Sequence, residues 1–338
     1  MKRKISFADK FLVAGSNGMV GRSVCKLLQE KGYGKKEFGG DLFMPNRKDL
    51  NLLNHDEVNI WFESNKPTVV ILAAAKVGGI FANSEFPYDF LMENLKIQNN
   101  VIEASWKNGI KRFLFLGSSC IYPKHAKQPI KEEYLMTNEL EKTNECYAIA
   151  KISGIKLCES LRKQYGFDAI SLMPTNLFGP GDNYHPLHSH VMASLIKKFS
   201  EATYYGRQTV TCWGTGNPLR EFMHVKDLAE AIIFCLENWD PSDDYSPKDD
   251  YGNPLSFLNV GTGKDISIKD LVNKISKALN FNGEIIWDKS KPDGTPKKLL
   301  DVSRIKALGW SPKIDLDDGL KDTLKVFKEN FNQNIHLD

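Results

Sequence analysis

The chain has 338 residues, of which 41% are hydrophobic and 26% are charged, and its formal net charge is +3. This length suffices for one large domain or two medium ones with a substantial hydrophobic core. The ordinary composition and small net charge give no indication of a nucleic-acid-binding protein. The sequence contains no run of about eighteen apolar residues, so no membrane span is predicted.

The cysteines and the amino-terminal residues bear on the cellular compartment. The six cysteines are scattered, with no CxxC pair and no His/Cys cluster of zinc-finger spacing, which favours free thiols in a reducing environment. The first ten residues are charged and lack the apolar segment of a signal peptide. His185, His188 and His190 share a loop without a carboxylate partner. We therefore expect a cytoplasmic protein without a metal site.

Short apolar runs alternate with helical patterns along the first half of the chain. Continuous apolar strands separated by helices are typical of a parallel sheet that is covered on both faces. The predicted fold class is therefore α/β, with a doubly wound parallel sheet of Rossmann type. Strands are predicted at residues 11–14, 42–44, 68–75, 112–117 and 169–173, and helices at residues 19–30 and 90–108.

The pattern becomes less regular after residue 174. We expect a cofactor-binding Rossmann domain at residues 1–180, to which the chain returns around residues 220–260. Residues 181–338 are expected to form mainly a smaller substrate-binding domain. Within this part we predict a functional loop at residues 176–186, helices at 191–201 and 268–279, an exposed insertion at 240–254 and an irregular segment at 291–298.

A GxxGxxG motif directly follows the first predicted strand and opens the first predicted helix. Glycines at such positions allow a tight turn and let a pyrophosphate approach the backbone, with the helix N-terminus facing the phosphates. The spacing alone is weak evidence, because a purely structural turn would also explain it. Its place between strand and helix favours cofactor binding. The residues concerned are Gly15, Ser16, Asn17, Gly18, Met19, Val20 and Gly21.

The choice between NAD and NADP depends on the second strand. Asp41 lies at the distance from the glycines where an acidic residue binds the ribose of NAD, but it precedes the end of the predicted strand. Arg47 and Lys48 lie nearer the strand tip, and two cations there suit the 2′-phosphate of NADP(H). We therefore favour NADP(H), with Arg47 as a ligand. The alternative is that both cations are solvated surface charges.

Tyr147 and Lys151 lie one turn apart on one face of a predicted helix. A nearby ammonium stabilises a phenolate, so it would bring the pKa of Tyr147 toward neutrality. Ser118 follows a predicted strand, at the sheet edge where ligands bind in α/β proteins, and could hydrogen-bond a substrate carbonyl. The YxxxK pattern alone is common and would usually be surface decoration, so the case depends on this context.

With the glycine turn, the strand-end serine and YxxxK in this order, the chain resembles the extended short-chain dehydrogenase/reductase family over nearly its whole length. The resemblance implies that Ser118 orients a carbonyl, Tyr147 donates a proton and Lys151 binds the nicotinamide ribose. Further contacts to the cofactor are implied for Leu116, Gly117, Ser118, Lys151, Pro174, Asn176, Leu177 and His190.

Six dispersed blocks are similar to the GDP-L-fucose synthase family. That family epimerises C3 and C5 of GDP-4-keto-6-deoxy-D-mannose and then reduces C4 with NADPH, which gives GDP-L-fucose. The resemblance implies the same activity for this chain, and a homodimer to whose interface residues 90–108 could contribute. The blocks are residues 74–80 (AAKVGGI), 117–123 (GSSCIYP), 174–180 (PTNLFGP), 185–191 (HPLHSHV), 213–222 (WGTGNPLREF) and 291–296 (KPDGTP).

Epimerisation at carbons that flank a ketone needs a base on one face of the sugar and an acid on the other. Cysteine and histidine can both exchange protons near neutral pH, and the resemblance places Cys120 and His190 in this pair. Without that context, Cys120 would be interpreted as a small buried residue and Trp213 as a core residue. Contacts to the GDP-sugar are implied for Lys198, Trp213, Arg220 and Asp293, although the adjacent Lys197 could face the substrate instead of Lys198.

The chain departs from the family pattern at three places, of which one is the stretch around residues 240–252, which looks longer than usual and has no assigned role. Other functions also stay open. Ser16 and Asn17 stand where a basic residue often contributes to the 2′-phosphate site, which leaves more of the NADP preference to Arg47. Cys146 stands where proline is common. Alternative functions are a 4-keto reductase without epimerisation, the same chemistry on another GDP-sugar such as a GDP-heptose, and a non-catalytic dinucleotide-binding subunit.

Overall fold

The computed structural model describes residues 3–186, 188–291 and 293–335. Two members of the sequence blocks above, Leu187 and Pro292, lie outside the described residues, as do residues 1–2 and 336–338.

The main sheet is parallel and has six strands within the described residues, in the order β2-β1-β3-β4-β5-β9. Its inner strands are buried along almost their whole length, as expected for a sheet that is covered on both faces. This arrangement confirms the predicted doubly wound α/β fold. The strands are β1 (Lys10–Ala14), β2 (Asp41–Phe43), β3 (Val69–Leu72), β4 (Arg112–Leu116), β5 (Ala169–Pro174) and β9 (Phe257–Val260).

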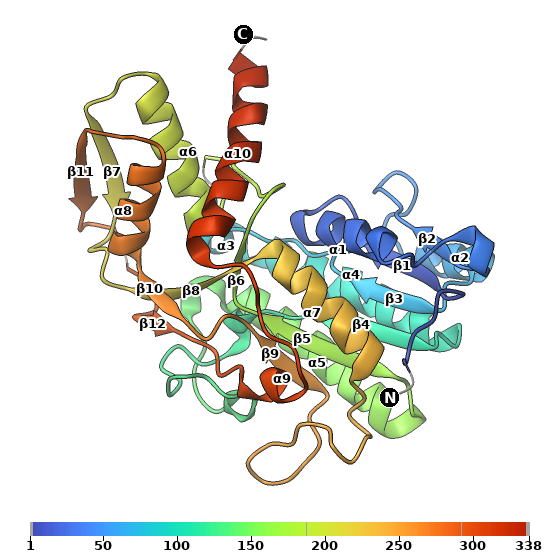
Figure 1. Ribbon diagram of the computed structural model, residues 1–338. Coiled ribbons are helices and arrows are strands. Elements are labelled where there is room, and N and C mark those ends of the chain that lie inside the picture. Colours follow the sequence, from blue (N-terminus) through green and yellow to red (C-terminus); the bar gives the residue numbers. More distant parts are fainter. Residues whose placement is uncertain (1–2, 187, 292, 336–338) are drawn as a thin grey trace.

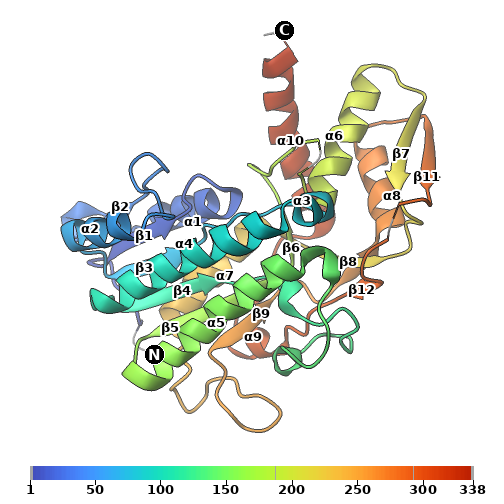
Figure 2. The same ribbon diagram turned by 180° about the vertical axis from the view of Figure 1, so that it is seen from behind.

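Helices cover both faces of this sheet (Figures 1 and 2). One face carries α1 (Met19–Glu30) and α7 (Val225–Asn238), which pack against each other. On the other face α4 (Pro87–Lys107) packs against both α2 (His55–Asn65) and α5 (Glu145–Tyr165). The predicted helices at residues 19–30 and 90–108 are thus confirmed, with the second beginning three residues earlier than expected.

The strand order reverses at β1, because β1 pairs with β2 on one side and with β3 on the other. In open α/β sheets such a reversal leaves a crevice at the carboxyl ends of the strands, where ligands bind. The glycine turn follows β1 and therefore lies at this crevice. The fold thus places the motif where a dinucleotide would be expected.

A smaller part of the molecule lies beside the main sheet and has its own hydrophobic cluster, which includes Phe199, Leu271 and Ile275 (Figure 1). Its strand β8 (Leu219–His224) pairs with β6 (Asn176–Phe178), β10 (Asp265–Ser267) and β12 (Lys297–Lys298). A separate pair is formed by β7 (Thr209–Trp213) and β11 (Glu284–Asp288). The helices of this smaller part are α6 (Val191–Tyr204), α8 (Ile268–Ala278) and α10 (Leu316–Ile335). Two further helices, α3 (Ile80–Glu85) and α9 (Ser303–Ala307), are short.

Two sequence predictions are wrong at the level of elements. Residues 176–186 were expected to be a loop throughout, but they begin with β6, and the segment 291–298 ends with β12. Both strands exist because they pair with β8. Such pairing is a tertiary interaction that a short local pattern does not encode.

The predicted insertion at residues 240–254 extends from the lower side of the molecule in Figure 1, but it is anchored at several points. Trp239, immediately before it, is buried and donates through Nε1 to Ser246 Oγ at 3.0 Å. Asp250 forms ion pairs with Lys131 at 2.7 Å and Arg304 at 3.3 Å. The insertion is therefore only partly exposed.

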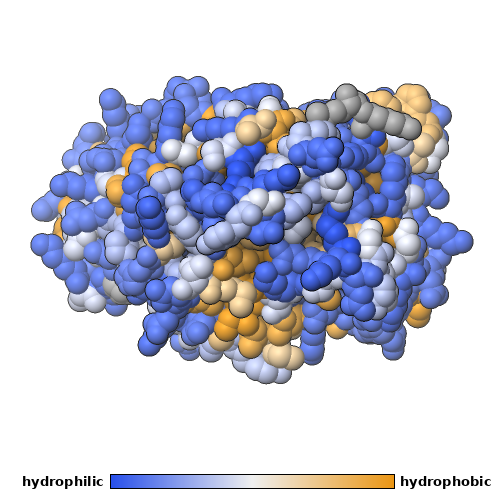
Figure 3. All heavy atoms as spheres, turned by 90° about the horizontal axis from the view of Figure 1, so that it is seen from below, coloured by the Kyte–Doolittle hydropathy of each residue, from blue (hydrophilic) through white to orange (hydrophobic). Residues whose placement is uncertain are grey.

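The surface seen from below is mostly hydrophilic and has an apolar patch near its lower middle (Figure 3). Among the described helices, none has the length and apolar character required to cross a membrane.

Candidate active site

The glycine turn brings the N-terminus of α1 against the crevice. Gly15 has φ +91°, and a Cβ added there would lie 2.6 Å from the Ala74 backbone nitrogen. At Gly21 a Cβ would lie 2.1 Å from Gly15 O, so both positions require glycine. Gly18 is the N-cap of α1 and places no side chain over the helix N-terminus. This cradle of backbone fits the pyrophosphate of a dinucleotide.

The residues after β2 are tied to this turn. Ser16 is buried and its hydroxyl donates to Pro45 O at 3.4 Å. Arg47 and Lys48 follow Pro45, are exposed, and have no ion-pair partner among the residues that the structure describes. Asp41 lies at the opposite, amino end of β2. Arg47 is thus nearer than Asp41 to the end of the sheet where the glycines lie.

Ser118, Tyr147 and Lys151 come together at the carboxyl end of β4. The Ser118 hydroxyl accepts a hydrogen bond from the Cys120 backbone N–H at 3.2 Å and also hydrogen-bonds the Tyr147 side chain. Lys151 is buried, and its Nζ donates to Leu116 O at 2.8 Å. The same Nζ lies 5.9 Å from the centre of the Tyr147 ring. The structure therefore brings the three residues of the predicted centre into one site.

The protonation of this centre differs from the sequence-based expectation. Burial raises the pKa of Tyr147 well above its usual value; the nearby Cys120 adds to this, and the hydrogen bond with Ser118 opposes it. Burial also lowers the pKa of Lys151 to about 7. The expected lowering of the tyrosine pKa by the lysine is therefore wrong, because loss of hydration dominates at both groups. Tyr147 therefore keeps its proton.

Cys120 lies next to this centre, between Tyr147 and a lysine that the sequence analysis did not single out. The Cys120 Sγ is 3.5 Å from Lys298 Nζ. His190 is the N-cap of α6 and remains accessible to solvent. Surrounding protein atoms lower the pKa of His190, and the positive charge of Lys298 lowers it further. Cys120 and His190 are thus linked through one cation.

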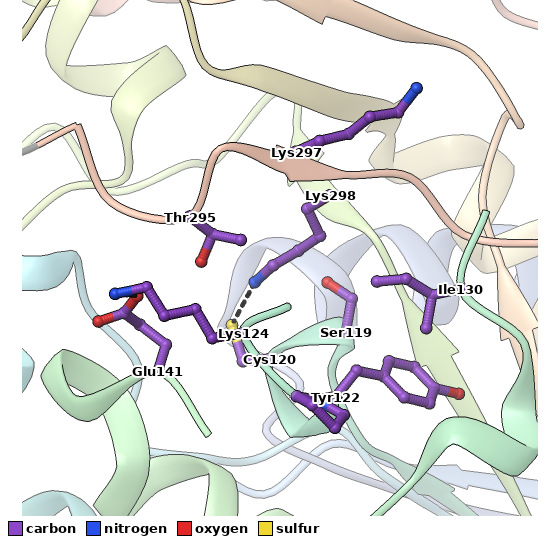
Figure 4. Close-up of a pocket in the computed structure, with 10 residues that line it drawn as sticks. Ser119, Cys120, Tyr122, Lys124, Ile130, Glu141, Thr295, Lys297 and Lys298 are labelled. Atoms are coloured by element: carbon purple, nitrogen blue, oxygen red, sulfur yellow. Dashed lines mark hydrogen bonds and ion pairs between the residues drawn. The ribbon is translucent and has the colours of Figure 1, made fainter. Parts of the chain in front are cut away.

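Figure 4 shows the pocket beside Cys120. Lys298 reaches down toward the sulfur, whereas Lys297 points away from it. Lys124 and Glu141 form an ion pair of 2.9 Å at the pocket. The lining residues are Ser119, Cys120, Tyr122, Pro123, Lys124, Ile130, Glu141, Thr295, Lys297 and Lys298.

Trp213 is half exposed, with 50% of its surface accessible, and is therefore not the core residue that its type alone would suggest. Lys198 Nζ lies 5.5 Å from the centre of its ring, and Lys291 Nζ lies 5.6 Å from it. Lys197 instead pairs with Glu201 at 3.9 Å along α6. Of the two adjacent lysines, Lys198 is thus the one that faces Trp213.

Arg220 and Asp293 lie together in the same part of the molecule. Asp293 accepts from the Thr215 backbone N–H at 2.7 Å and from the Thr215 hydroxyl at 2.8 Å. Its carbonyl oxygen accepts from Arg220 Nη2 at 3.4 Å. Burial lowers the pKa of Arg220, and within the described residues no carboxylate lies within 4.0 Å of its guanidinium. A desolvated, unpaired guanidinium is suited to an anionic ligand.

Comparisons with known proteins agree with this geometry. The model of the NAD dependent epimerase/dehydratase family matches residues 11–246. The chain is 47% identical to GDP-L-fucose synthase 1 of Arabidopsis thaliana, over 95% of the chain and 94% of that protein. It is 46% identical to GDP-L-fucose synthase of Escherichia coli (strain K12), over 95% of the chain and 97% of that protein. The chain belongs to the GDP-L-fucose synthase family.

Solved structures extend this likeness. A GDP-6-OMe-4-keto-L-xylo-heptose reductase from Campylobacter jejuni matches with a TM-score of 0.88 and 34% identity, over 96% of the chain and 99% of that protein. A GDP-L-fucose synthetase from Naegleria fowleri bound to NADP matches with a TM-score of 0.83 and 26% identity, over 98% of both chains.

Glu221 has a structural role that the sequence did not reveal. Its buried carboxylate accepts from the backbone N–H groups of Gly263 at 2.7 Å and Leu300 at 3.0 Å. The Asn176 amide donates to the Glu221 carbonyl at 2.8 Å, so this predicted cofactor ligand also joins β6 to β8. Together these bonds fix the backbone on the carboxyl side of Lys298.

The remaining predicted cofactor ligands lie at the ends of the strands nearby. Leu116 ends β4 and Gly117 follows it, while Pro174 ends β5 and Leu177 lies in β6. In the part of the chain that the structure describes, no group of three or more His, Cys, Asp or Glu side chains is arranged to hold a metal ion.

Proposed function

We propose that this protein converts GDP-4-keto-6-deoxy-D-mannose to GDP-L-fucose, by epimerisation at C3 and C5 followed by reduction of the C4 ketone with NADPH. The observation that carries the proposal is the position of Cys120 directly beside the Ser118–Tyr147 hydrogen bond. A group that can exchange protons with carbon thus adjoins the groups that would hold the ketone oxygen. Identities of 43–47% to GDP-L-fucose synthases over about 95% of the chain support the same activity.

The cofactor of this enzyme is NADP(H), and when bound it supplies the hydride. The backbone cradle of residues 15–21 would hold its pyrophosphate, and Arg47 its 2′-phosphate. Lys151 would hold the nicotinamide ribose, next to Leu116 O, to which it donates. Leu116, Gly117, Pro174, Asn176, Leu177 and His190 would complete the contacts at the strand ends.

The same oxygen site serves both stages of the reaction. Protons at C3 and C5 are acidic because the C4 ketone accepts the resulting negative charge. Ser118 and Tyr147 would donate hydrogen bonds to that oxygen and stabilise the enolate. Cys120 and His190 would exchange protons with the sugar carbons on opposite faces. In the reduction, Tyr147 would give its proton to the C4 oxygen, and the high pKa of Tyr147 keeps that proton available.

The nucleotide part of the substrate would be bound by the smaller part of the molecule. Arg220 and Lys198 supply positive charge for the diphosphate, and Trp213 offers an accessible ring between two lysines. Asp293 is held in place by Thr215. We accordingly propose residues 1–180, with a return at 220–260, as the NADP(H)-binding domain and residues 181–338 as mainly the GDP-sugar-binding domain. The pairing of β9 with β5 supports the return.

We also propose a homodimer in the cytoplasm. The outer sides of α4 and α5 carry apolar side chains that are at least partly exposed, including Tyr88, Leu95 and Ile149. These two helices pack side by side (Figure 2). An exposed apolar face shared by two helices is suited to a symmetric contact with a second copy. The six free cysteines are those expected in a reducing compartment.

Deuterium labelling tests the proposed function. The protein is incubated with GDP-4-keto-6-deoxy-D-mannose and NADPH in deuterated water, and the product is analysed by NMR. We expect consumption of NADPH and deuterium at both C3 and C5. Consumption of NADPH without label would instead establish a 4-keto reductase. The likeness to the C. jejuni heptose reductase also suggests this alternative.

A further inference from the structure

Lys298 contacts the Cys120 sulfur, with 3.5 Å between Nζ and Sγ. Within the described residues, Lys298 forms no ion pair with a carboxylate. An ammonium in contact with a sulfur atom and without a competing anion stabilises the thiolate form. The contact crosses 178 positions of sequence, so it is a product of the fold.

The backbone holds Lys298 in place on both sides. Lys298 pairs with Arg220 in the register of β12 and β8. The next residue, Leu299, donates its N–H to Gln128 Oε1 at 2.8 Å, and Leu300 donates to the buried Glu221 carboxylate at 3.0 Å. The flexible part of the lysine is therefore limited to its side chain, which extends toward Cys120 (Figure 4).

Lys297, the preceding residue on the same strand, provides a natural comparison. Successive side chains of a strand point to opposite faces, and Lys297 accordingly points away from Cys120 (Figure 4). Its Nζ forms an ion pair with Asp265 at 3.1 Å. Two lysines of the same type thus differ in whether they reach the sulfur.

The other charged groups around Cys120 have partners elsewhere. Lys124 is paired with Glu141 at 2.9 Å. Arg220 contributes an electrostatic interaction with Cys120, but its guanidinium donates to the carbonyl oxygens of Leu219 and Asp293. On the α5 side Cys120 faces the Tyr147 hydroxyl, which is neutral, because burial raises the pKa of Tyr147.

We propose that Lys298 is a positioning residue for the proton exchange at the sugar carbons: its ammonium contacts the Cys120 sulfur, holds that sulfur at the substrate pocket and stabilises negative charge on it. Burial lowers the pKa of His190, the second member of the pair, and the charge of Lys298 lowers it further. In the step itself, the sulfur takes a proton from carbon and the C–H electron pair enters the enolate. Its oxygen is held by Ser118 and Tyr147, and His190 returns a proton from the opposite face. The role of Lys298 in the proton exchange rests on the proposed function, whereas its effect on the Cys120 sulfur does not.

The test measures alkylation of Cys120 by iodoacetamide as a function of pH, because only the thiolate reacts. Peptide mass spectrometry follows each cysteine separately. Cys146 is the other cysteine that is not fully buried, so it serves as an internal reference in the same sample. In the unaltered protein Cys120 should react faster than Cys146 at pH 7, because a positive charge lies beside its sulfur. Lys298→Met removes that charge and should slow the reaction of Cys120 at pH 7 about tenfold.

Two variants control for structural effects. Lys298→Arg keeps the charge and should retain most of the reactivity of Cys120, and Lys297→Met should leave the pH profile unchanged. An unchanged profile in Lys298→Met would overturn the proposal. So would a profile of Cys120 in the unaltered protein that coincides with that of Cys146, a comparison that needs no variant to fold.

A second measurement separates this inference from the proposed function. With substrate in deuterated water, Lys298→Met should slow the incorporation of label at C3 and C5, with Lys298→Arg intermediate. If the unaltered protein incorporates no label while the alkylation results are as expected, the proposed epimerisation is wrong and the role of Lys298 toward Cys120 stands. If label appears at normal rates in Lys298→Met, the positioning role is wrong.

Discussion

Lys151 is a buried cation whose only hydrogen bond within the described residues is to a backbone carbonyl, Leu116 O. Burial lowers its pKa from 10.5 to about 7. A charged group that loses hydration without gaining an opposite charge destabilises the folded chain. The residue is therefore retained for binding or catalysis at a cost in stability, and this cost depends on pH.

The sign of that dependence follows from the two pKa values. Below pH 7 Lys151 is charged in both states, so the full penalty applies. Between about pH 7 and 10.5 the unfolded chain binds more protons, so the contribution of Lys151 to stability rises with pH. Lys151→Met should abolish reduction while raising the free energy of unfolding at pH 6 by about 2–4 kcal/mol. Thermal unfolding at pH 6 and pH 9.5 checks this, since the gain should shrink at the higher pH; a gain independent of pH would contradict the explanation.

At the scale of residues, sequence analysis succeeds where the chemistry is local. The Tyr147–Lys151 pair lies within one helical turn, so its relative position follows from the predicted helix. Lys298 and Glu221 had no such signal, because their partners are 178 and 79 positions away in sequence. The pKa of Tyr147 was mispredicted for a related reason: burial depends on the packing of the whole site, which the motif does not contain.

At the scale of elements, Gly18 and Gly21 at the start of α1 differ in the space that they leave for a side chain. Gly21→Ala would put a Cβ 2.1 Å from Gly15 O, so the turn and the helix must separate. We expect it to cost about 1–3 kcal/mol of stability, as overpacking does, and to weaken NADPH binding. At Gly18 a Cβ would lie 3.5 Å from Gly15 O, an ordinary contact, but it would occupy the place proposed for the phosphates.

Gly18→Ala is therefore the matched variant. It should lose NADPH affinity by about tenfold or more while the stability changes by less than about 1 kcal/mol, the range for an N-cap glycine. Chemical unfolding and NADPH fluorescence titration measure the two effects. If Gly18→Ala binds NADPH normally, the N-terminus of α1 is not the phosphate site.

The elements themselves show why some were predictable. Strands β1, β3, β4 and β5 are mostly apolar because both faces of the sheet are covered, and α1 keeps its helical period from end to end. Strand β12 has two residues, both lysines, and exists only through pairing with β8. A strand of that kind has no hydrophobic period to detect.

At the scale of the whole molecule, the exposed apolar face of α4 and α5 predicts the assembly. Ile149 lies on α5 with 41% of its surface exposed, between Tyr147 and Lys151 in sequence but on the outer side of the helix. Placing a charge at the centre of a dimer contact requires burying that charge without a partner. Ile149→Glu should therefore convert a dimer into monomers.

Ile286 offers the matched control, because it lies on β11 in the smaller part of the molecule and has 42% of its surface exposed. Ile286→Glu makes the same chemical change at nearly the same exposure and should leave the dimer intact. Sedimentation velocity at micromolar concentration measures the mass of both variants. The prediction is wrong if the unaltered protein is a monomer or if the dimer persists in Ile149→Glu. In either case the apolar face of α4 and α5 is not a contact between copies. Because Tyr147 and Lys151 share a helix with Ile149, an Ile149→Glu monomer that loses activity would further show that the dimer holds α5, and with it the catalytic centre, in position.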